Sequence, residues 1–389
     1  MNGRQISTMA PSHNFIPSYV HIFLFDMDGV ITSEACYWDA ARLTVLEVLG
    51  HPHYASWKAT GFDPTAPLET LLARSQSLLS DGTIAQIKAR AINTNWDVAY
   101  LMASLYLVHL CSQLAPADRK QMEGPLAASG WNASTLQLLG SLLPLPRGGG
   151  EGLADMPRGS ALWSDFAAFL GERKGFAALE ALNAYWQART GQPSAPFQRG
   201  EGFWRFCQEL FQAWYLGRGL IHRERPLLPA ERVRETLTCL QEAGCTLGVA
   251  TGRPYPEIVP PLEAMGLLSL FDPNHFATHR EVEAAEAELR REGLEAALSK
   301  PHPFLFLRAL YPRLSAQEIW QGRYSPATHR EVAVVGDAVS DVVAAKAIGC
   351  YSISVLTGGG TADALREAGT DCILPDMTDL PSHWKGPAR

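Results

Sequence analysis

A short apolar run ends abruptly in two carboxylates at residues 22–28, IFLFDMD. A continuous run of large apolar residues, such as that from Ile22 to Phe25, is typical of a strand buried on both faces of a helix-covered parallel sheet. In such sheets ligands bind just beyond the carboxyl ends of the strands, which is where Asp26 and Asp28 stand. Two carboxylates this close repel each other and favour a cation or a shared proton nearby. The alternative is an ordinary Asp-Gly turn after a strand.

Segments of the same type return in the second half of the chain. Buried strands are predicted at 246–251, 331–337, 351–356 and 372–375, and a weaker strand at 275–282. Helical patterns separate these strands, which indicates βαβ units with parallel strands and right-handed crossovers. The predicted fold class is therefore α/β, with a Rossmann-like parallel sheet as its core.

A long helical segment is inserted after the first strand. Residues 35–222 show helical periodicity with few β-branched runs, interrupted by a Pro/Gly-rich stretch at 143–159 that is expected to be a mobile loop. We therefore predict an α/β core domain from residues 20–34 and 223–389, and a helical domain from 35–222. Residues 1–19 are predicted to be a flexible leader, and they lack the apolar stretch of a signal peptide.

Composition excludes several classes of function. The net charge of -7 and the scattered basic residues argue against a nucleic-acid surface. The seven cysteines form no CxxC pair, so reduced thiols in a cytoplasmic protein fit better than a disulfide framework or a zinc cluster. The most apolar window, residues 98–111, is too short to span a bilayer and predicts a buried helix instead.

Other polar residues stand, like Asp26 and Asp28, at predicted strand ends, and one stands in a loop just before a predicted helix. Thr251 and Gly252 end the strand at 246–251, Lys300 stands in the loop SKPHP, and Asp337 and Asp341 follow the strand at 331–337. Because the carboxyl ends of parallel strands lie on one edge of a sheet, these groups are expected to converge with Asp26. Carboxylate oxygens suit Mg²⁺, while the threonine, the glycine amide and the lysine can bind a phosphate. Each residue alone has an ordinary explanation as a strand-end or helix-start residue.

Four segments resemble the motifs of a known family. FDMDGV, ATGRP, SKPHP and VVGDAVSD are similar to the four motifs of the haloacid dehalogenase-like hydrolases. The likeness is greatest to the phosphatase branch with a helical cap after the first strand, the phosphoglycolate phosphatase and β-phosphoglucomutase group. It covers residues 20–34 and 225–378, and it implies that residues 35–222 form the cap.

The resemblance also implies roles for the matching residues. Asp26 would attack phosphorus, form an aspartyl-phosphate and bind Mg²⁺. Asp28 would protonate the leaving oxygen and then activate water, with its backbone carbonyl on the metal. Thr251 and Lys300 would hold the phosphoryl group. The remaining ligands of Mg²⁺ would be Asp337 and Asp341.

Asp28 separates two activities within the family. Dehalogenases resemble the first motif but lack this second aspartate, because they protonate no leaving alkoxide. We therefore expect a Mg²⁺-dependent phosphatase acting on a small organic phosphate monoester. A phosphomutase that returns the phosphoryl group to a sugar hydroxyl, or a retired fold that serves as a binding module, is the alternative.

Substrate contacts are less constrained by the sequence. Glu34 and Arg253 flank the predicted site and are expected either to touch substrate or to pair with other charges, and Trp38 is expected near the hinge of the cap. The tryptophans of the cap favour an apolar substrate or, as the better interpretation, the core of a helical bundle. They stand at positions 38, 57, 96, 131, 163, 186, 204 and 214.

Overall fold

The computed structural model describes residues 15–52, 62–92, 94–143, 156–224, 226–384 and 386. Most of the expected flexible leader and of the Pro/Gly-rich stretch at 143–159 therefore lies outside the described residues. The chain divides into two compact units. The first, called the sheet unit below, comprises the chain up to Glu34 together with Glu224 onward. The second, the helical unit, comprises Ala35–Arg223.

The sheet unit is built on a parallel sheet, so the predicted α/β fold class is confirmed. Its strands lie in the order β3-β2-β1-β4-β5-β6, and every neighbouring pair is parallel. Their bounds are β1 Ile22–Phe25, β2 Thr246–Ala250, β3 Phe276–Ala277, β4 Val332–Gly336, β5 Tyr351–Val355 and β6 Cys372–Leu374. The first strand is central, with Phe25 in register with Val249 of β2 and Val335 of β4.

Alternating side chains of the strands enter two apolar layers. Phe23 and Phe25 belong to one layer, whereas Leu24 between them belongs to the other. Because both faces are covered, a central strand of this sheet favours apolar residues at every position, as the sequence of β1 has. The first layer receives α11 (Ala230–Glu242), α12 (Val259–Ala264) and α18 (Leu380–His383). The second receives α13 (His279–Arg291), α14 (Phe304–Leu310), α15 (Ala316–Trp320) and α16 (Val339–Ala347). The helix α17 spans Ala362–Glu367.

One strand is shorter than the sequence predicts. Only Phe276 and Ala277 of the expected strand at 275–282 pair with β2. The next residue, Thr278, ends the strand because it forms a capping box with Glu281, whose Oε2 accepts hydrogen bonds from the Thr278 amide (2.8 Å) and hydroxyl (2.5 Å). This cap starts α13 where the strand was expected to continue.

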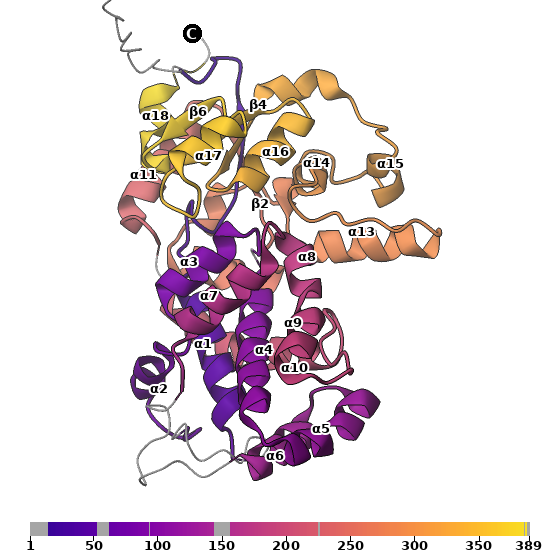
Figure 1. The fold of residues 1–389 in the computed structure, drawn as a ribbon. Helices are drawn as coiled ribbons and strands as arrows, with labels where there is room; N and C mark the ends of the chain where they lie inside the picture. The colour runs from indigo at the N-terminus through magenta and orange to yellow at the C-terminus, as the bar shows by residue number, and fades with distance from the viewer. Residues whose placement is uncertain are drawn as a thin grey trace, which may run out of the picture. The chain divides into compact units, whose positions relative to one another are not determined.

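The helical unit forms its own apolar core. Helices α1 and α4 lie side by side in it, and α10 packs on both (Figure 1). Most of the window at 98–111 is buried in α4, and within the described residues no helix is long and apolar enough to cross a membrane. The bounds are α1 Ala35–Gly50, α2 Leu68–Ser75, α3 Asp81–Ala89, α4 Asn95–Gln113, α5 Pro116–Ser129, α6 Ala133–Leu142, α7 Gly159–Leu170, α8 Gly175–Glu180, α9 Leu182–Thr190 and α10 Phe203–Gln212.

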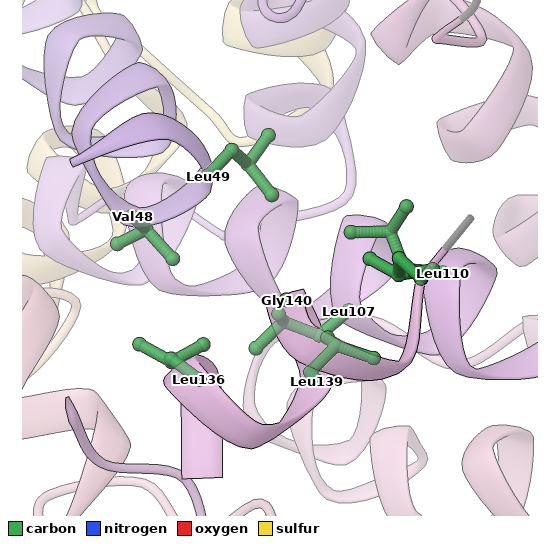
Figure 2. Close-up of a pocket in the computed structure, with 8 residues that line it drawn as sticks. Val48, Leu49, Leu107, Leu110, Leu136, Leu139 and Gly140 are labelled. Atoms are coloured by element: carbon green, nitrogen blue, oxygen red, sulfur yellow. The ribbon is translucent and has the colours of Figure 1, made fainter. Parts of the chain in front are cut away.

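Aromatic side chains fill this core. Trp131, Trp186 and Trp214 are almost fully buried, and the rings of Trp131 and Trp186 meet edge-on at 6.0 Å. An apolar gap remains between α1, α4 and α6, lined by the residues that Figure 2 draws, among them Val48, Leu107 and Leu136. Its volume is about 10 Å³, which is room for a single water at most. These tryptophans and this gap belong to helix packing, in line with the core interpretation of the tryptophans.

Candidate active site

Three carboxylates meet at the carboxyl edge of the sheet. Asp26 directly follows β1, Asp337 directly follows β4, and Asp341 lies in the first turn of α16. The ladder between β1 and β4 continues to the amide of Asp26, which donates to the carbonyl of Val335 at 2.9 Å. One carboxylate oxygen from each of the three aspartates lies within 4.8 Å of the other two. The structure thus brings together the residues proposed from their strand-end positions.

A lysine with only 11% of its side chain exposed neutralises part of this cluster. The Nζ atom of Lys300 lies 2.9 Å from Oδ2 of Asp26 and 2.7 Å from Oδ1 of Asp341. Burial acts to lower the pKa of Lys300, but the two carboxylates outweigh it and raise that pKa. The lysine is therefore a fixed positive charge at the site.

Two carboxylates of the cluster, those of Asp26 and Asp337, resist ionisation. Burial raises the pKa of Asp26 to about 6, against the opposing pull of Lys300 and with support from the neighbouring carboxylates. Burial also raises the pKa of Asp337 well above its ordinary range, and the charges of Asp341 and Asp26 add to the effect. A cation is strongly favoured where like charges lie close together and raise the pKa of a neighbouring carboxyl group.

A glycine-rich loop after β5 encloses Asp337. The amide of Gly359 donates to Oδ2 of Asp337 at 2.7 Å, and the amide of Gly360 donates to its carbonyl at 3.0 Å. A Cβ atom at Gly358 would lie 1.9 Å from Oδ2 of Asp337, and one at Gly29 would lie 2.4 Å from the same oxygen. Only residues without a side chain fit this close approach.

The second aspartate of the first motif has a different surrounding. The carboxylate of Asp28 receives the Nε group of Arg253 at 2.9 and 3.0 Å, and a further contact from Nη2 of the same residue. Nη1 of Arg253 donates to both carboxylate oxygens of Glu224 at 2.8 Å. The side chains of Arg253 and Glu224 are only 2% and 1% exposed, whereas that of Asp28 is 24% exposed. The chain of three charges thus runs from a buried pair to a partly exposed carboxylate.

The expected phosphate-binding residues of the second motif lie at the same edge of the sheet. Thr251 directly follows β2, the neighbour of β1, and is buried. Its hydroxyl accepts a hydrogen bond from the amide of Arg253 at 3.3 Å. Gly252 is exposed, and a Cβ atom there would touch none of the described residues within 4 Å. Their position beside Asp26 is thus set by the pairing of β2 with β1.

Of the three residues expected to contact substrate, Glu34 and Arg253 belong to the sheet unit and Trp38 belongs to the helical unit. Glu34 is the last residue of the sheet unit before the helical insertion, and its charge contributes to the raised pKa of Asp337. Arg253 pairs with charges, as described above. Trp38 belongs to α1 and packs against the core of the helical unit.

Two features of the site escaped the sequence-based prediction. Glu224 has no signal in its local sequence, because its role depends on an arginine 29 residues away that folds against it. The glycine run at 358–360 does carry a signal, since three glycines just beyond the predicted strand at 351–356 indicate a close backbone approach.

Comparisons with known proteins identify hydrolases to which this chain is similar. A family model described as HAD-hydrolase-like matches residues 297–380, which include Lys300, Asp337 and Asp341. The phosphoglycolate phosphatase of Yersinia pseudotuberculosis is 27% identical over 176 residues, 44% of this chain and 61% of its own length. That of Escherichia coli strain K12 is 28% identical over 177 residues, 45% of this chain and 57% of its own. Each match thus spans less than two thirds of the curated relative.

A solved structure matches over nearly the whole chain. The crystal structure of Northeast Structural Genomics Consortium target ZR25 is similar with a TM-score of 0.73 and 26% sequence identity. The similarity covers 93% of this chain and 98% of that one, so it includes the helical insertion as well as the sheet unit.

Proposed function

The chain belongs to the haloacid dehalogenase-like hydrolases, and we propose that it is a phosphatase that uses Mg²⁺ to hydrolyse a small organic phosphate monoester. The observation that carries the proposal is the cluster of Asp26, Asp337 and Asp341 beside Lys300. Three acids and one buried cation, all at the carboxyl edge of a parallel sheet, suit the transfer of a dianionic phosphoryl group.

The donor set fits a magnesium ion. Three hard carboxylate oxygens within 4.8 Å of one another are the ligands that Mg²⁺ prefers, and their mutual repulsion favours a divalent cation among them. Asp26, Asp337 and Asp341 would hold it. When bound, the ion would offset negative charge on these carboxylates and on the phosphoryl oxygens.

The chemistry is assigned to two aspartates. A carboxylate oxygen of Asp26 attacks phosphorus, the bond from phosphorus to the ester oxygen breaks, and Asp28 donates its proton to that oxygen, which leaves as the alcohol. Asp28 then takes a proton from a water molecule, whose oxygen attacks phosphorus and breaks its bond to Asp26. Inorganic phosphate and free Asp26 result.

Other residues support these steps. The Lys300 ammonium offsets the negative charge of the phosphoryl group during both transfers. Thr251, with the amide of Gly252, donates hydrogen bonds to its oxygens. The helical unit Ala35–Arg223 is proposed to act as the cap that excludes water from the first transfer.

A hydrolysis assay on a panel of phosphate monoesters tests the proposal. The panel includes phosphoglycolate, because two curated relatives are named for it, together with sugar and nucleotide phosphates. We expect release of inorganic phosphate that requires Mg²⁺ and that is lost in Asp26→Asn. Asp363→Asn is the matched control, because that side chain is 97% exposed and should leave the rate unchanged.

Three outcomes of this assay oppose the proposal. No phosphate release from any ester would contradict it. An isomerised sugar phosphate in place of free phosphate would identify a phosphomutase. Full biological activity of Asp26→Asn would identify a binding module.

A further inference from the structure

Arg253 determines how the Asp28 carboxylate is oriented. Its Nε group lies 2.9 Å from Oδ1 and 3.0 Å from Oδ2 of Asp28, so one planar guanidinium engages both oxygens. The Thr32 hydroxyl adds only a longer contact of 3.4 Å to Oδ1. A guanidinium that meets a carboxylate in this way fixes both its direction and its distance.

Arg253 is itself held by Glu224. Its Nη1 group donates to both oxygens of that carboxylate at 2.8 Å, and its guanidinium makes a weaker contact of 3.4 Å with the carbonyl of Glu257. The Glu224 side chain is almost completely buried, and a buried carboxylate is tolerated only when a cation pairs with it. Separating Arg253 from Glu224 would therefore carry a large free-energy cost.

The position of Glu224 in the chain adds to this argument. It is the first residue of the sheet unit after the helical insertion Ala35–Arg223. The charge chain from Glu224 through Arg253 thus links the point where the chain returns from the insertion to the second aspartate of the first motif.

We propose that Arg253 is a positioning residue for Asp28 and that Glu224 holds Arg253 in the required place. This inference rests on the proposed function, in which Asp28 is the general acid and base. Proton transfer requires an oxygen of Asp28 within hydrogen-bond reach of the leaving oxygen and then of the water. A carboxylate with a different orientation misses both partners, so Arg253 acts on the rate through Asp28.

The dependence of the rate on the leaving group distinguishes positioning from general damage. An alkyl phosphate releases a strongly basic alkoxide and needs the proton of Asp28, whereas nitrophenyl phosphate releases a weakly basic phenolate and needs it little. In Arg253→Lys we expect kcat/KM to fall by about 10²-fold for an alkyl phosphate but by less than about tenfold for nitrophenyl phosphate. The lysine keeps the charge that Glu224 requires but cannot engage both carboxylates with a planar fork. Arg280→Lys, at an exposed arginine, is the matched control and should change neither rate.

A double variant tests whether Arg253 works through Asp28. If it does, Asp28→Asn combined with Arg253→Lys should be no slower than Asp28→Asn alone, because the second change removes a function already lost. If the two losses multiply instead, Arg253 acts independently of Asp28, and the inference is wrong.

A second variant covers the case in which Arg253→Lys does not fold. Glu224→Gln keeps the shape of the side chain and removes the charge that holds Arg253. We expect the same selectivity, with the alkyl phosphate affected at least about threefold more than nitrophenyl phosphate. Crystal structures of the wild-type protein and of the variant add a readout independent of activity. The Asp28 carboxylate should move in the variant, and an unchanged carboxylate would overturn the inference.

The outcomes separate this inference from the proposed function. If the wild-type protein hydrolyses neither ester, the phosphatase proposal fails and the role of Arg253 fails with it. If the wild-type protein is active but the variant loses the same factor on both esters, only the role of Arg253 is overturned.

Discussion

The glycine-rich loop after β5 offers a sharp test of the proposed metal site. A Cβ atom at Gly358 would lie 1.9 Å from Oδ2 and 2.4 Å from Cγ of Asp337. Atoms in favourable contact are about 3.5–4.0 Å apart, so in Gly358→Ala the carboxylate or the loop must shift by more than about 1 Å. The loop itself is tied down, because Gly360 donates to the carbonyl of Asp337 and the Thr357 hydroxyl donates to the carbonyl of Gly29 at 2.6 Å. The shift should therefore fall mainly on the Asp337 carboxylate.

The size of the effect follows from this displacement. A misplacement of about 1 Å at a reacting site costs about 10²-fold in rate, or about 3 kcal/mol of transition-state stabilisation. We expect Gly358→Ala to lower kcat/KM by about this factor and to raise the Mg²⁺ concentration for half-maximal rate by about 10-fold or more. Gly359→Ala is the matched control. Its Cβ atom would lie 3.9 Å from Oδ2 of Asp337, an ordinary contact, and its amide can still donate to that oxygen.

Phosphate release measured over a series of Mg²⁺ concentrations provides the assay, with thermal unfolding as a check that both variants fold. The control should stay within about threefold of the wild-type rate. If both variants kept the rate and the Mg²⁺ requirement of the wild-type protein, the steric argument would be refuted. Equal losses in both would refute it as well, because Gly359→Ala creates no close contact.

Three further predictions concern charge. Lys300→Met should lower the hydrolysis rate by about 10³-fold, measured as phosphate release, because the charge beside the phosphoryl group is lost. Burial raises the pKa of Asp26 from 3.8 to about 6. In the metal-free protein, the neutral carboxyl group therefore makes its full contribution to folding stability below pH 3.8, and this contribution is lost as the pH rises through about 6. The contribution lost over this pH range is about 3 kcal/mol of folding free energy. Because Mg²⁺ needs the ionised carboxylate, the rise in melting temperature on adding Mg²⁺ should be larger near pH 7.5 than near pH 5. Asp97→Asn should lower the free energy of unfolding by about 2 kcal/mol, because Asp97 is buried and binds Arg199 at 2.9 Å. Glu69→Gln, in the exposed pair with Arg223, should lower it by less than about 1 kcal/mol. Urea unfolding measures both.

Residues that follow a buried strand could be located from the sequence. A strand covered on both faces favours an unbroken apolar run, so the ends of β1 and β4 are visible where Asp26 and Asp337 stand. The parallel sheet then places such ends on one edge, and this geometry needs no knowledge of individual contacts. The convergence of Lys300 with these residues does not follow from that rule, because the lysine stands in a loop ahead of α14 and not at a strand end. That loop could be recognised only from its motif.

Contacts between distant side chains could not be predicted in this way. Arg253 lies 225 residues from Asp28, and the sequence left open whether it would bind substrate or another charge. The choice depends on which carboxylates the folded chain buries beside it, and Glu224 has no distinguishing neighbours. The short β3 shows a similar limit, because a local cap at Thr278 ended a strand that the residue pattern would have continued.

The charges at the edge of the sheet explain why these residues need one another. Asp26, Asp337 and Asp341 carry three negative charges when ionised, and Lys300 offsets one of them. Two negative charges are left, which is the charge that a single divalent cation cancels. When no cation is bound, burial and the neighbouring carboxylates hold the pKa values of Asp26 and Asp337 high. The Asp28 carboxylate is bound instead by Arg253, although its charge still helps to raise the pKa of Asp26. In the proposed mechanism, these different surroundings of two neighbouring carboxylates would let one motif supply both a nucleophile and an acid.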